Sequence, residues 1–314
     1  MGAEKQSMGG WQGGKGAIAL LASVACWGMS TSLSKGVLDY LPPLTLLTVQ
    51  LLGSAGFLWG LLWAQGEARS QTVWNWQTLR FGLTGLLEPG LAYSLGIVGL
   101  TLTTASNASL ISATEPVLIV LLSGVVLRER VPRSLLLWTG LAIAGVSLIV
   151  GIEGIAQGDR SIWGDGLILL GSAAAALYVV LTKRFMAALA PLPLAALQQS
   201  AGLLWAIALW SLWEMAGNAT PMSQVEWGTW AIALLSGVIN YAVPVWLYLL
   251  ALNQMRASIT AIFLTLIPVF GIGSAFLFLD ERLGAMQWIG AAVIVAAVIR
   301  VGWGQSATAK DAAN

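Results

Sequence analysis

The chain is built from long apolar runs joined by short polar connections. A run of about 20 apolar residues is the length that crosses a bilayer as a helix. The connections carry helix breakers, such as the pair Pro42-Pro43. Ten such runs predict ten transmembrane helices, over residues 17–38, 44–64, 79–99, 104–127, 134–152, 164–185, 193–213, 229–252, 256–279 and 284–303. We therefore predict an all-α integral membrane protein.

Composition supports this fold class and removes several functions. Hydrophobic residues make up 57% of the chain, charged residues only 9%, and the mean hydropathy is +0.80, whereas a soluble domain is about 25% charged. A net charge of +1 gives no basic patch for nucleic acid. The single cysteine, Cys26, excludes an internal disulfide, and the absence of histidine removes the commonest zinc ligand. We expect no cofactor and no metal; the lipid bilayer and a small-molecule substrate are the expected partners.

Lysine and arginine predict the orientation through the positive-inside rule. With a cytoplasmic N-terminus, 12 of them lie inside and only Lys35, Arg160 and Arg282 lie outside. The inside set is Lys5, Lys15, Arg69, Arg80, Arg128, Arg130, Arg133, Lys183, Arg184, Arg256, Arg300 and Lys310. We expect a protein of the bacterial plasma (inner) membrane with two cytoplasmic tails, residues 1–15 and 304–314.

The chain contains an internal repeat. One group of motifs recurs 152 positions later: Ala105-Ser106, Pro116 and Glu129-Arg130 return as Ala257-Ser258, Pro268 and Glu281-Arg282. Nearer the N-terminus the offset is 148, as for Lys35 with Lys183 and Gln50 with Gln198. Each copy, 16–152 and 163–303, holds five predicted helices. Because five is odd, the second copy must be inserted upside down, which predicts an inverted-topology repeat.

These motifs resemble the EamA type of the drug/metabolite transporter superfamily. The resemblance rests on Trp27-Gly28, Lys35, the Ala-Ser, proline and Glu-Arg series, and Gly164-Asp165, and it spans about residues 16–303. It implies a ten-helix bundle whose first, third, fourth, sixth, eighth and ninth helices line a central cavity, usually for exporting small metabolites. This sequence departs from a symmetric pattern, because Ala175-Ala176 stands where the first half has Trp27-Gly28.

Two acids near helix centres are the main candidate site residues. Glu88 and Glu115 are followed by Pro89 and Pro116. An unpaired carboxylate in lipid is costly, so each acid should face a wet cavity, find a donor or be protonated. Proline interrupts helices, and transporters build sites at such breaks. The alternative is a protonated, hydrogen-bonded acid that serves only helix packing. Break points are expected near Pro89, Pro116, Pro244 and Pro268.

Helical spacing adds further candidates. Thr84, Gly85, Glu88 and Ala92 share a face, and their equivalents are Ser236, Gly237, Asn240 and Pro244. Ser112 shares a face with Glu115. Trp27 and Tyr178 lie on equivalent helices, and Trp27 is either a stacking platform for a bound molecule or a core residue. Gln50 and Gln198 are weaker candidates. The predicted site is therefore Glu88, Glu115, Trp27, Tyr178, Asn240, Ser112 and Thr84.

Other features have structural as well as functional interpretations. Lys35 fits a snorkelling side chain or an outer gate. Arg128-Glu129-Arg130 and Asp280-Glu281-Arg282 fit interface anchors or gates. Gly56 and Gly60 form a small-xxx-small pair that favours packing inside the bundle over a dimer contact. A monomer and a homodimer both remain open.

These observations favour a secondary carrier that works by alternating access of two halves. An intramembrane enzyme is the rival class, but the chain lacks histidine, a nucleophile elbow and a phosphate-binding loop. A receptor or scaffold ranks between the two. No lysine or arginine lies near a helix centre, so an amine-bearing or neutral solute, such as an amino acid or organic cation, fits better than a phosphate. Protons are a further candidate partner, since the two acids can change protonation.

Overall fold

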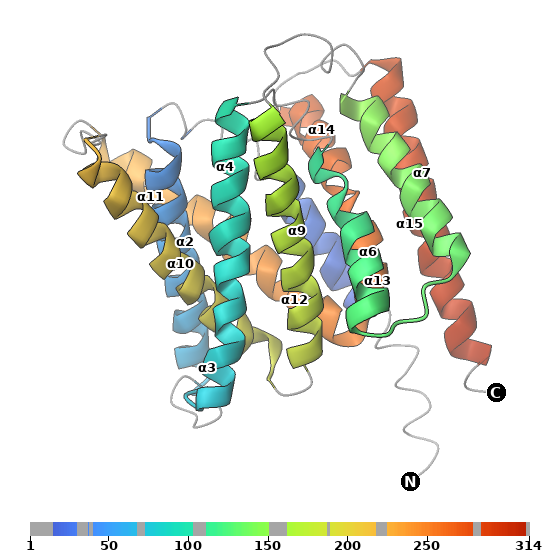
Figure 1. Ribbon diagram of the computed structural model, residues 1–314, viewed down its shortest axis with the longest axis horizontal. Coiled ribbons are helices and arrows are strands. Elements are labelled where there is room, and N and C mark those ends of the chain that lie inside the picture. Colours follow the sequence, from blue (N-terminus) through green and yellow to red (C-terminus); the bar gives the residue numbers. More distant parts are fainter. Residues whose placement is uncertain are drawn as a thin grey trace.

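The computed structural model describes residues 15–29, 37, 40–67, 73–102, 111–150, 162–186, 189–217, 225–278 and 284–311. Its long elements are all α-helices, which stand side by side and run alternately up and down (Figure 1). The α-helices are Lys15–Met29, α2 Pro43–Ala64, α3 Trp76–Gly82, α4 Ala92–Leu102, α6 Glu115–Val126, α7 Arg133–Val150, α9 Ile162–Phe185, α10 Pro191–Met215, α11 Trp227–Gly237, α12 Val243–Gln254, α13 Ala257–Leu264, α14 Ile267–Phe278 and α15 Ala285–Asp311.

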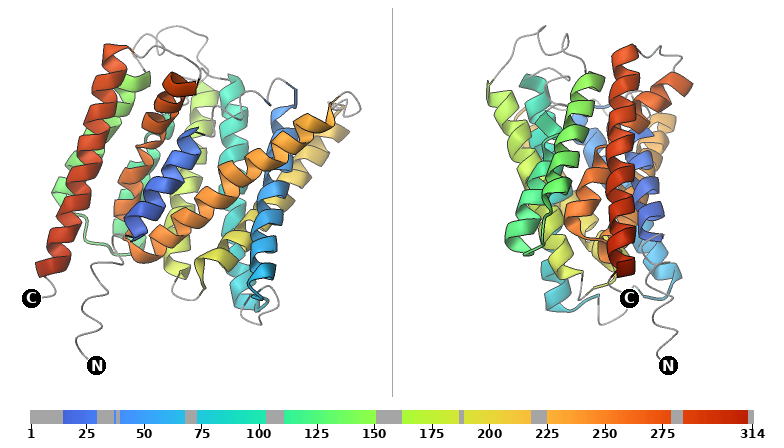
Figure 2. Two further views of the ribbon diagram at one scale, coloured as in Figure 1. Left: turned by 180° about the vertical axis from the view of Figure 1, so that it is seen from behind. Right: turned by 90° about the vertical axis from the view of Figure 1, so that its right-hand side faces the viewer.

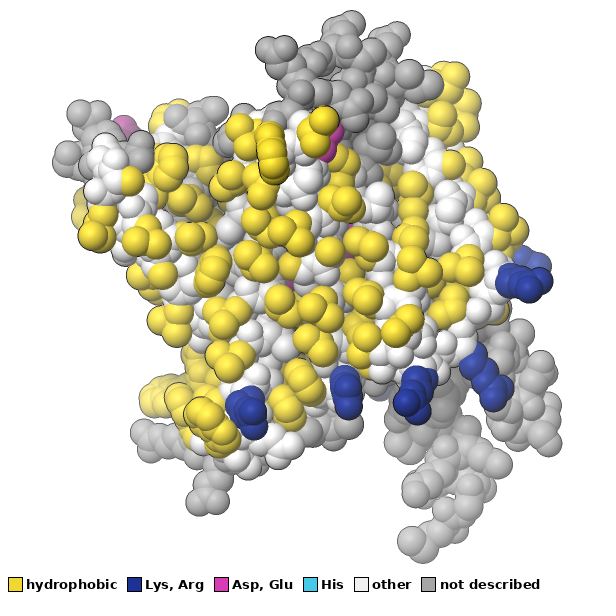
Figure 3. All heavy atoms as spheres, in the orientation of Figure 1, with side chains coloured by type: hydrophobic (Ala, Val, Ile, Leu, Met, Phe, Trp, Pro, Cys, Tyr) yellow, Lys and Arg dark blue, Asp and Glu magenta, His cyan; other side chains and the backbone are white. Residues whose placement is uncertain are grey.

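Several of these helices have the length and composition of membrane spans. Within the described ranges, six helical stretches meet both criteria: Pro43–Ala64, Trp76–Gly99, Ile162–Phe185, Pro191–Met215, Trp227–Gln254 and Ala257–Ser274. Four shorter apolar helices accompany them: Lys15–Met29, Glu115–Val126, Arg133–Ile149 and Ala285–Val301. Large apolar side chains cover the face shown in Figure 3, which suits contact with lipid chains.

Four of the expected spans are interrupted beside a proline. The run over 79–99 breaks into a 3₁₀ turn, η1 Leu83–Leu86, and a π turn, η2 Leu87–Leu91, and a second π turn, η4 Val238–Ala242, separates α11 from α12. The breaks expected near Pro89, Pro116, Pro244 and Pro268 are therefore present, because proline lacks the N–H that continues a helix and is tolerated in its first turn. The expected span over 256–279 accordingly consists of two helices, with a turn at Thr265 between α13 and α14.

Buried glutamines connect the two sequence repeats at equivalent positions. Gln50 on α2 donates from Nε2 to Ser236 Oγ at 3.0 Å, and Gln198 on α10 donates from Nε2 to Thr84 Oγ1 at 2.8 Å. Both glutamine side chains are buried. A buried amide is costly unless it is hydrogen-bonded, so these two residues hold the halves together and are not among the residues that line the cavity described below.

Each of these contacts includes a glycine that lies against backbone. A Cβ placed on Gly85 would lie 2.0 Å from the Gln198 carbonyl oxygen, and one placed on Gly237 would lie 2.0 Å from the Gln50 carbonyl oxygen. Only glycine permits this approach. The segment 83–91 of the first half thus packs on α10 of the second, and α11 of the second half packs on α2 of the first.

The helices of the two halves run in opposite directions. Helix 15–29 rises from the lower end of the bundle in Figure 1, whereas α9, its sequence equivalent, descends from the upper end. Figure 2 shows helix 15–29 beside α12, where Ser23 Oγ donates to the Pro244 carbonyl oxygen at 2.7 Å. Most of the lysine and arginine side chains visible in Figure 3 lie near the lower end. On this face the described lysine and arginine side chains therefore mark the lower end of the bundle.

Two details differ from the sequence expectations. Gly56 and Gly60 are exposed, and a Cβ on either would meet nothing within 4 Å in the described structure, so their expected role in packing inside the bundle was wrong. The final helix α15 continues to Asp311, beyond residue 303 where the predicted helix ends. Residues 1–14 of the expected N-terminal tail, together with Lys35 and Asp280-Glu281-Arg282, lie outside the described residues.

Candidate functional site

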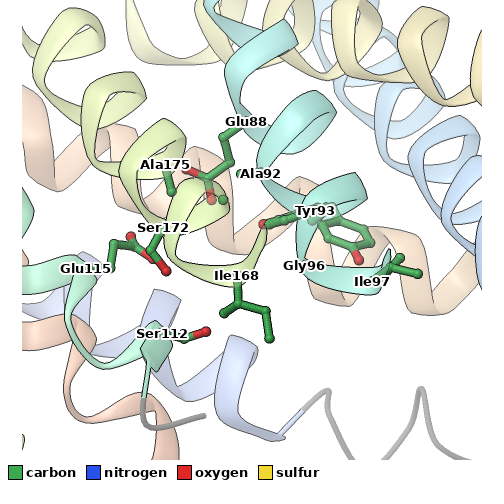
Figure 4. Close-up of a pocket in the computed structure, with 12 residues that line it drawn as sticks. Glu88, Ala92, Tyr93, Gly96, Ile97, Ser112, Glu115, Ile168, Ser172 and Ala175 are labelled. Atoms are coloured by element: carbon green, nitrogen blue, oxygen red, sulfur yellow. The ribbon is translucent and has the colours of Figure 1, made fainter. Parts of the chain in front are cut away.

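A cavity of about 330 Å³ lies between α4, α6 and α9 (Figure 4). Its described lining consists of two acids, two tyrosines, two serines and small or apolar residues: Glu88, Glu115, Tyr93, Tyr241, Ser112, Ser172, Ala92, Gly96, Ile97, Ile168, Gly171 and Ala175. No lysine or arginine belongs to this described lining. The cavity is large enough for a small organic molecule.

Two helix faces form most of the wall. On the helix that continues from η2 into α4, the lining positions are 88, 92, 93, 96 and 97, which is the spacing of one helix face. On α9 they are 168, 171, 172 and 175. Gly96 leaves room in the cavity, since a Cβ there would meet nothing within 4 Å, and Gly171 lies against the Ala92 carbonyl oxygen. Small residues therefore both open the cavity and join its walls.

The helix breaks position the two acids. Glu88 has non-helical backbone angles, φ −146° and ψ 123°, inside η2, and Glu115 is the first residue of α6. Both residues are half-buried, and their side chains point into the same space in Figure 4. Tyr93 lines the same cavity as the two acids. Two carboxyl groups that face one small space favour a bound cation or a proton, because their charged forms repel each other.

The structure places three of the seven predicted site residues together at the cavity: Glu88, Glu115 and Ser112. The other four lie elsewhere. Thr84 and Tyr178 both bond to Gln198, Thr84 as the acceptor described above and Tyr178 by donating from its hydroxyl to Gln198 Oε1 at 3.0 Å.

Trp27 and Asn240 also stand apart from the described lining. Trp27 packs against the main core, with its ring centroid 5.7 Å from that of Tyr248. Of the two roles expected for Trp27, this position fits the core residue. Asn240, the sequence equivalent of Glu88, lies in η4.

Sequence reasoning did not select Tyr93, Tyr241 and Ser172. Tyr93 follows Ala92, so the helical spacing that selected Ala92 could have found it. Ser172 lies three residues before Ala175, which lines the same cavity, so spacing along α9 could have found it as well. Tyr241 follows the selected Asn240 and lies four residues after Gly237, so the same spacing could have found it.

The cavity occupies the upper part of the bundle. Three of its four lining residues on α9 come from the first half of that helix, which is the upper half in Figure 1, and the fourth, Ala175, lies just past the middle. The lower half of α9 is packed: Val179, Val180 and Thr182 are at most 2% exposed. The lower ends of α12 and α13 are also buried, as Leu252 and Ala257 show. The space below the acids is therefore closed by side chains.

Apolar helices of membrane length around a cavity that contains acidic groups are features expected of a membrane transport protein. The chain belongs to the EamA-like transporter family, whose family model matches residues 14–151 and again residues 162–303. It is a membrane transporter and not an enzyme.

Similar proteins agree with this assignment. The chain is 27% identical to an uncharacterized transporter of Synechocystis, over 90% of this chain and 88% of that protein, and 29% identical to one of Archaeoglobus fulgidus, over 90% and 95%. It is 27% identical to a probable terminal-alkyne amino-acid exporter of Streptantibioticus cattleyicolor, over 63% of this chain and 64% of that protein. One solved crystal structure matches with a TM-score of 0.74 at 18% identity, covering 90% of this chain and 94% of the other, which shows a shared fold.

Proposed function

We propose that this protein is a secondary transporter that exports a small amine-bearing or neutral organic solute, such as an amino acid or organic cation, by alternating access of two inverted five-helix repeats. The observation that carries the proposal is the cavity in which Glu88 and Glu115 converge, with no lysine or arginine in its described lining. A substrate amine would find its counter-charge there, whereas a phosphate would meet like charge.

The repeat architecture rests on three observations. The same family model matches the chain twice, over 14–151 and 162–303. Helix 15–29 and α9 run in opposite directions. Equivalent glutamines, Gln50 and Gln198, bond to equivalent hydroxyls on the opposite half. Ten transmembrane helices, domains over 16–152 and 163–303, and cytoplasmic tails at 1–15 and 304–314 follow as parts of this proposal. In a bacterium the protein would lie in the inner membrane.

The lower end of the bundle in Figure 1 is assigned to the cytoplasm. Most of the visible lysine and arginine side chains gather near that end, and positive charge marks cytoplasmic loops. Cysteines introduced one at a time and labelled from either side of the membrane test this orientation. A cysteine at residues 130–132 should react from inside, and one at residues 281–282 should react from outside. Reaction of both sites from the same side would contradict the inverted repeat.

Export is supported by a relative, and proton coupling by chemistry. The partial relative from Streptantibioticus cattleyicolor is named as an amino-acid exporter. Two acids that repel each other in one cavity can release a proton when a cationic solute enters and take one up when it leaves. The same acids could instead stay charged opposite a substrate amine without any proton movement.

A transport screen on purified protein in liposomes tests the function. Radiolabelled amino acids, primary amines and a sugar phosphate are offered at equal concentration, with protein-free liposomes as the control. We expect uptake or exchange of an amine-bearing or neutral solute and none of the sugar phosphate. Repeating the flux with and without an imposed pH gradient separates proton coupling from facilitated diffusion. Flux of the sugar phosphate alone would contradict the proposed substrate class.

A further inference from the structure

In the connection between α6 and α7, the side chain of Glu129 contacts the second half of the molecule. After α6, Arg128 adopts a left-handed conformation with φ 54°, and the Glu129 N–H donates to the Ser123 carbonyl oxygen at 3.2 Å. A left-handed residue without glycine's freedom is uncommon. This turn directs the Glu129 side chain to the beginning of α13.

Glu129 caps α13 from outside that helix. Its Oε1 accepts the Ala257 N–H at 3.0 Å and its Oε2 accepts the Ser258 N–H at 3.1 Å. The helix has no side-chain cap of its own, since Arg256 stands at its N-cap position. The first N–H groups of a helix need partners from elsewhere, and a negative charge is favourable at this end. One carboxylate therefore satisfies both needs across two halves.

Arg256 reinforces the contact from the solvent side. Its Nε lies 3.7 Å from Glu129 Oε2, and its Nη2 donates to the Arg130 carbonyl oxygen. The Glu129 side chain is only 10% exposed, whereas that of Arg256 is 41% exposed. Water and salt screen the ion pair, so the two backbone N–H groups are the partners of Glu129 that are shielded best from solvent.

The contact lies at the closed end of the bundle. Ala257 and Ser258 are fully buried, and so are the following residues of α13 through Ile262, apart from a 6% exposure of Ile259. The acids of the cavity lie above this packed region, on the first turn of α6 and in η2. For the cavity to open downward, the connection after α6 must separate from α13, and both N–H groups must lose the carboxylate.

We propose that Glu129 is a latch that closes the lower end of the transport path by capping α13. The idea rests on the proposed alternating access. It also accounts for two motifs of the sequence repeat, because the Glu-Arg motif of the first half is bonded to the Ala-Ser motif of the second. The remaining copies of these motifs, Ala105-Ser106 and Glu281-Arg282, lie outside the described residues.

Two cysteine reporters can measure the latch without a substrate. In a Cys26→Ser background, Ser258→Cys reports the lower end: the Ser258 side chain is fully buried and its hydroxyl has no hydrogen-bond partner in the described structure, so the replacement removes no bond. Ser112→Cys reports the cavity from above, because Ser112 lines the cavity and is exposed. A maleimide reagent is applied to purified protein in detergent micelles, where both ends are accessible.

Glu129→Gln should shift the two reporters in opposite directions. The amide keeps one acceptor but loses the charge, so labelling of Ser258→Cys should rise about fivefold to tenfold, while labelling of Ser112→Cys falls. Arg256→Gln should raise the Ser258→Cys rate only about twofold, because that side chain is partly exposed and its ion pair is screened. The matched control is Glu67→Gln, the same change at an exposed glutamate beyond the end of α2, which should leave both rates unchanged.

Every other outcome contradicts the latch. If both labelling rates rise with Glu129→Gln, the residue maintains the fold and does not close one end. If neither rate changes, the contact plays no part in closure. Because no substrate is involved, failure of the transport screen with opposite labelling shifts would reject the proposed substrate and leave the latch intact.

Discussion

The two π turns of this molecule lie at corresponding places in the two halves but differ in backbone and in chemistry, because only η2 contains a residue with non-helical backbone angles, Glu88. Each follows a glycine that lies against a glutamine carbonyl of the other half, Gly85 before η2 and Gly237 before η4. In η2 the equivalent position is Glu88, which lines the cavity; in η4 it is Asn240, which is not part of the described lining. Both halves thus have a π turn beside the glycine contact, while only the first has a non-helical residue there and supplies an acid.

The same asymmetry extends to the whole cavity. Both acids, Glu88 and Glu115, come from the first half, whereas the second half contributes tyrosine, serine, small and aliphatic residues to the described lining. Under the proposed alternating access, a π turn in both halves suits a movement that both must perform, and a single acidic wall suits a ligand with one positive pole. The proposal thus assigns movement to the shared π turns and recognition to the acids of the first half.

The glycines should be the most sensitive shared feature. Gly85→Ala and Gly237→Ala each place a methyl group 2.0 Å from a backbone oxygen, and backbone cannot yield as a side chain does. We expect each variant to lose about 3 kcal/mol of unfolding free energy, measured by denaturant unfolding in detergent. Gly56→Ala, at an exposed site on α2, serves as the control and should be neutral or slightly stabilising. A large loss in only one of the two variants would show that the contacts are not equivalent.

The acids should be the most sensitive unshared feature. In the double variant Glu88→Gln, Glu115→Gln, the amides are nearly isosteric with protonated acids, so the fold should survive. Transport of the substrate found in the liposome screen should fall about 100-fold or lose its pH dependence, since the charge or exchangeable proton is gone. Of the single variants, we expect Glu115→Gln to matter more. Full transport with an unchanged pH profile in the double variant would make both acids packing residues.

The hydroxyls that receive the buried glutamines should make similar contributions. Thr84→Val removes the acceptor of the Gln198 amide, and Ser236→Ala removes that of the Gln50 amide. Each should cost about 1–2 kcal/mol of unfolding free energy, and in the Thr84 variant Gln198 Nε2 keeps its bond to Thr182 Oγ1 at 3.0 Å. Thermal unfolding monitored by tryptophan fluorescence measures both losses. A loss below about 0.5 kcal/mol in either variant would show that its hydroxyl contributes little to the contact between the halves.

Asn240 should show the smallest effect. Because it lies outside the described cavity lining, Asn240→Ala should change the transport rate by less than about threefold. The comparison is with Glu88→Gln at the equivalent position, assayed in the same liposomes. An equal loss of transport in both variants would place the second π turn at the substrate and end the distinction between the two breaks.

The sequence predicted the fold class better than it predicted the site. Apolar runs and prolines mark helices and their interruptions through local chemistry, so most helix positions and all four breaks could be anticipated. The partners of a side chain depend on packing between distant segments, and local spacing does not contain that information. Thr84 and Tyr178 lie on plausible faces, yet both are hydrogen-bonded to Gln198. Tyr241 lines the cavity, whereas its neighbour Asn240, which the repeat pairs with Glu88, does not belong to the described lining.

The contacts of Gly85 and Gly237 also bear on how such proteins diverge. Each glycine meets a main-chain oxygen, an atom that every amino acid possesses, so the fit between the halves constrains the glycine far more than the residue opposite. The close fit between the halves then depends on glycine at these two positions, while the side chains of the residues opposite them can change. A solved structure that is only 18% identical to this chain still has the same fold, with a TM-score of 0.74, so the fold itself tolerates wide differences in sequence.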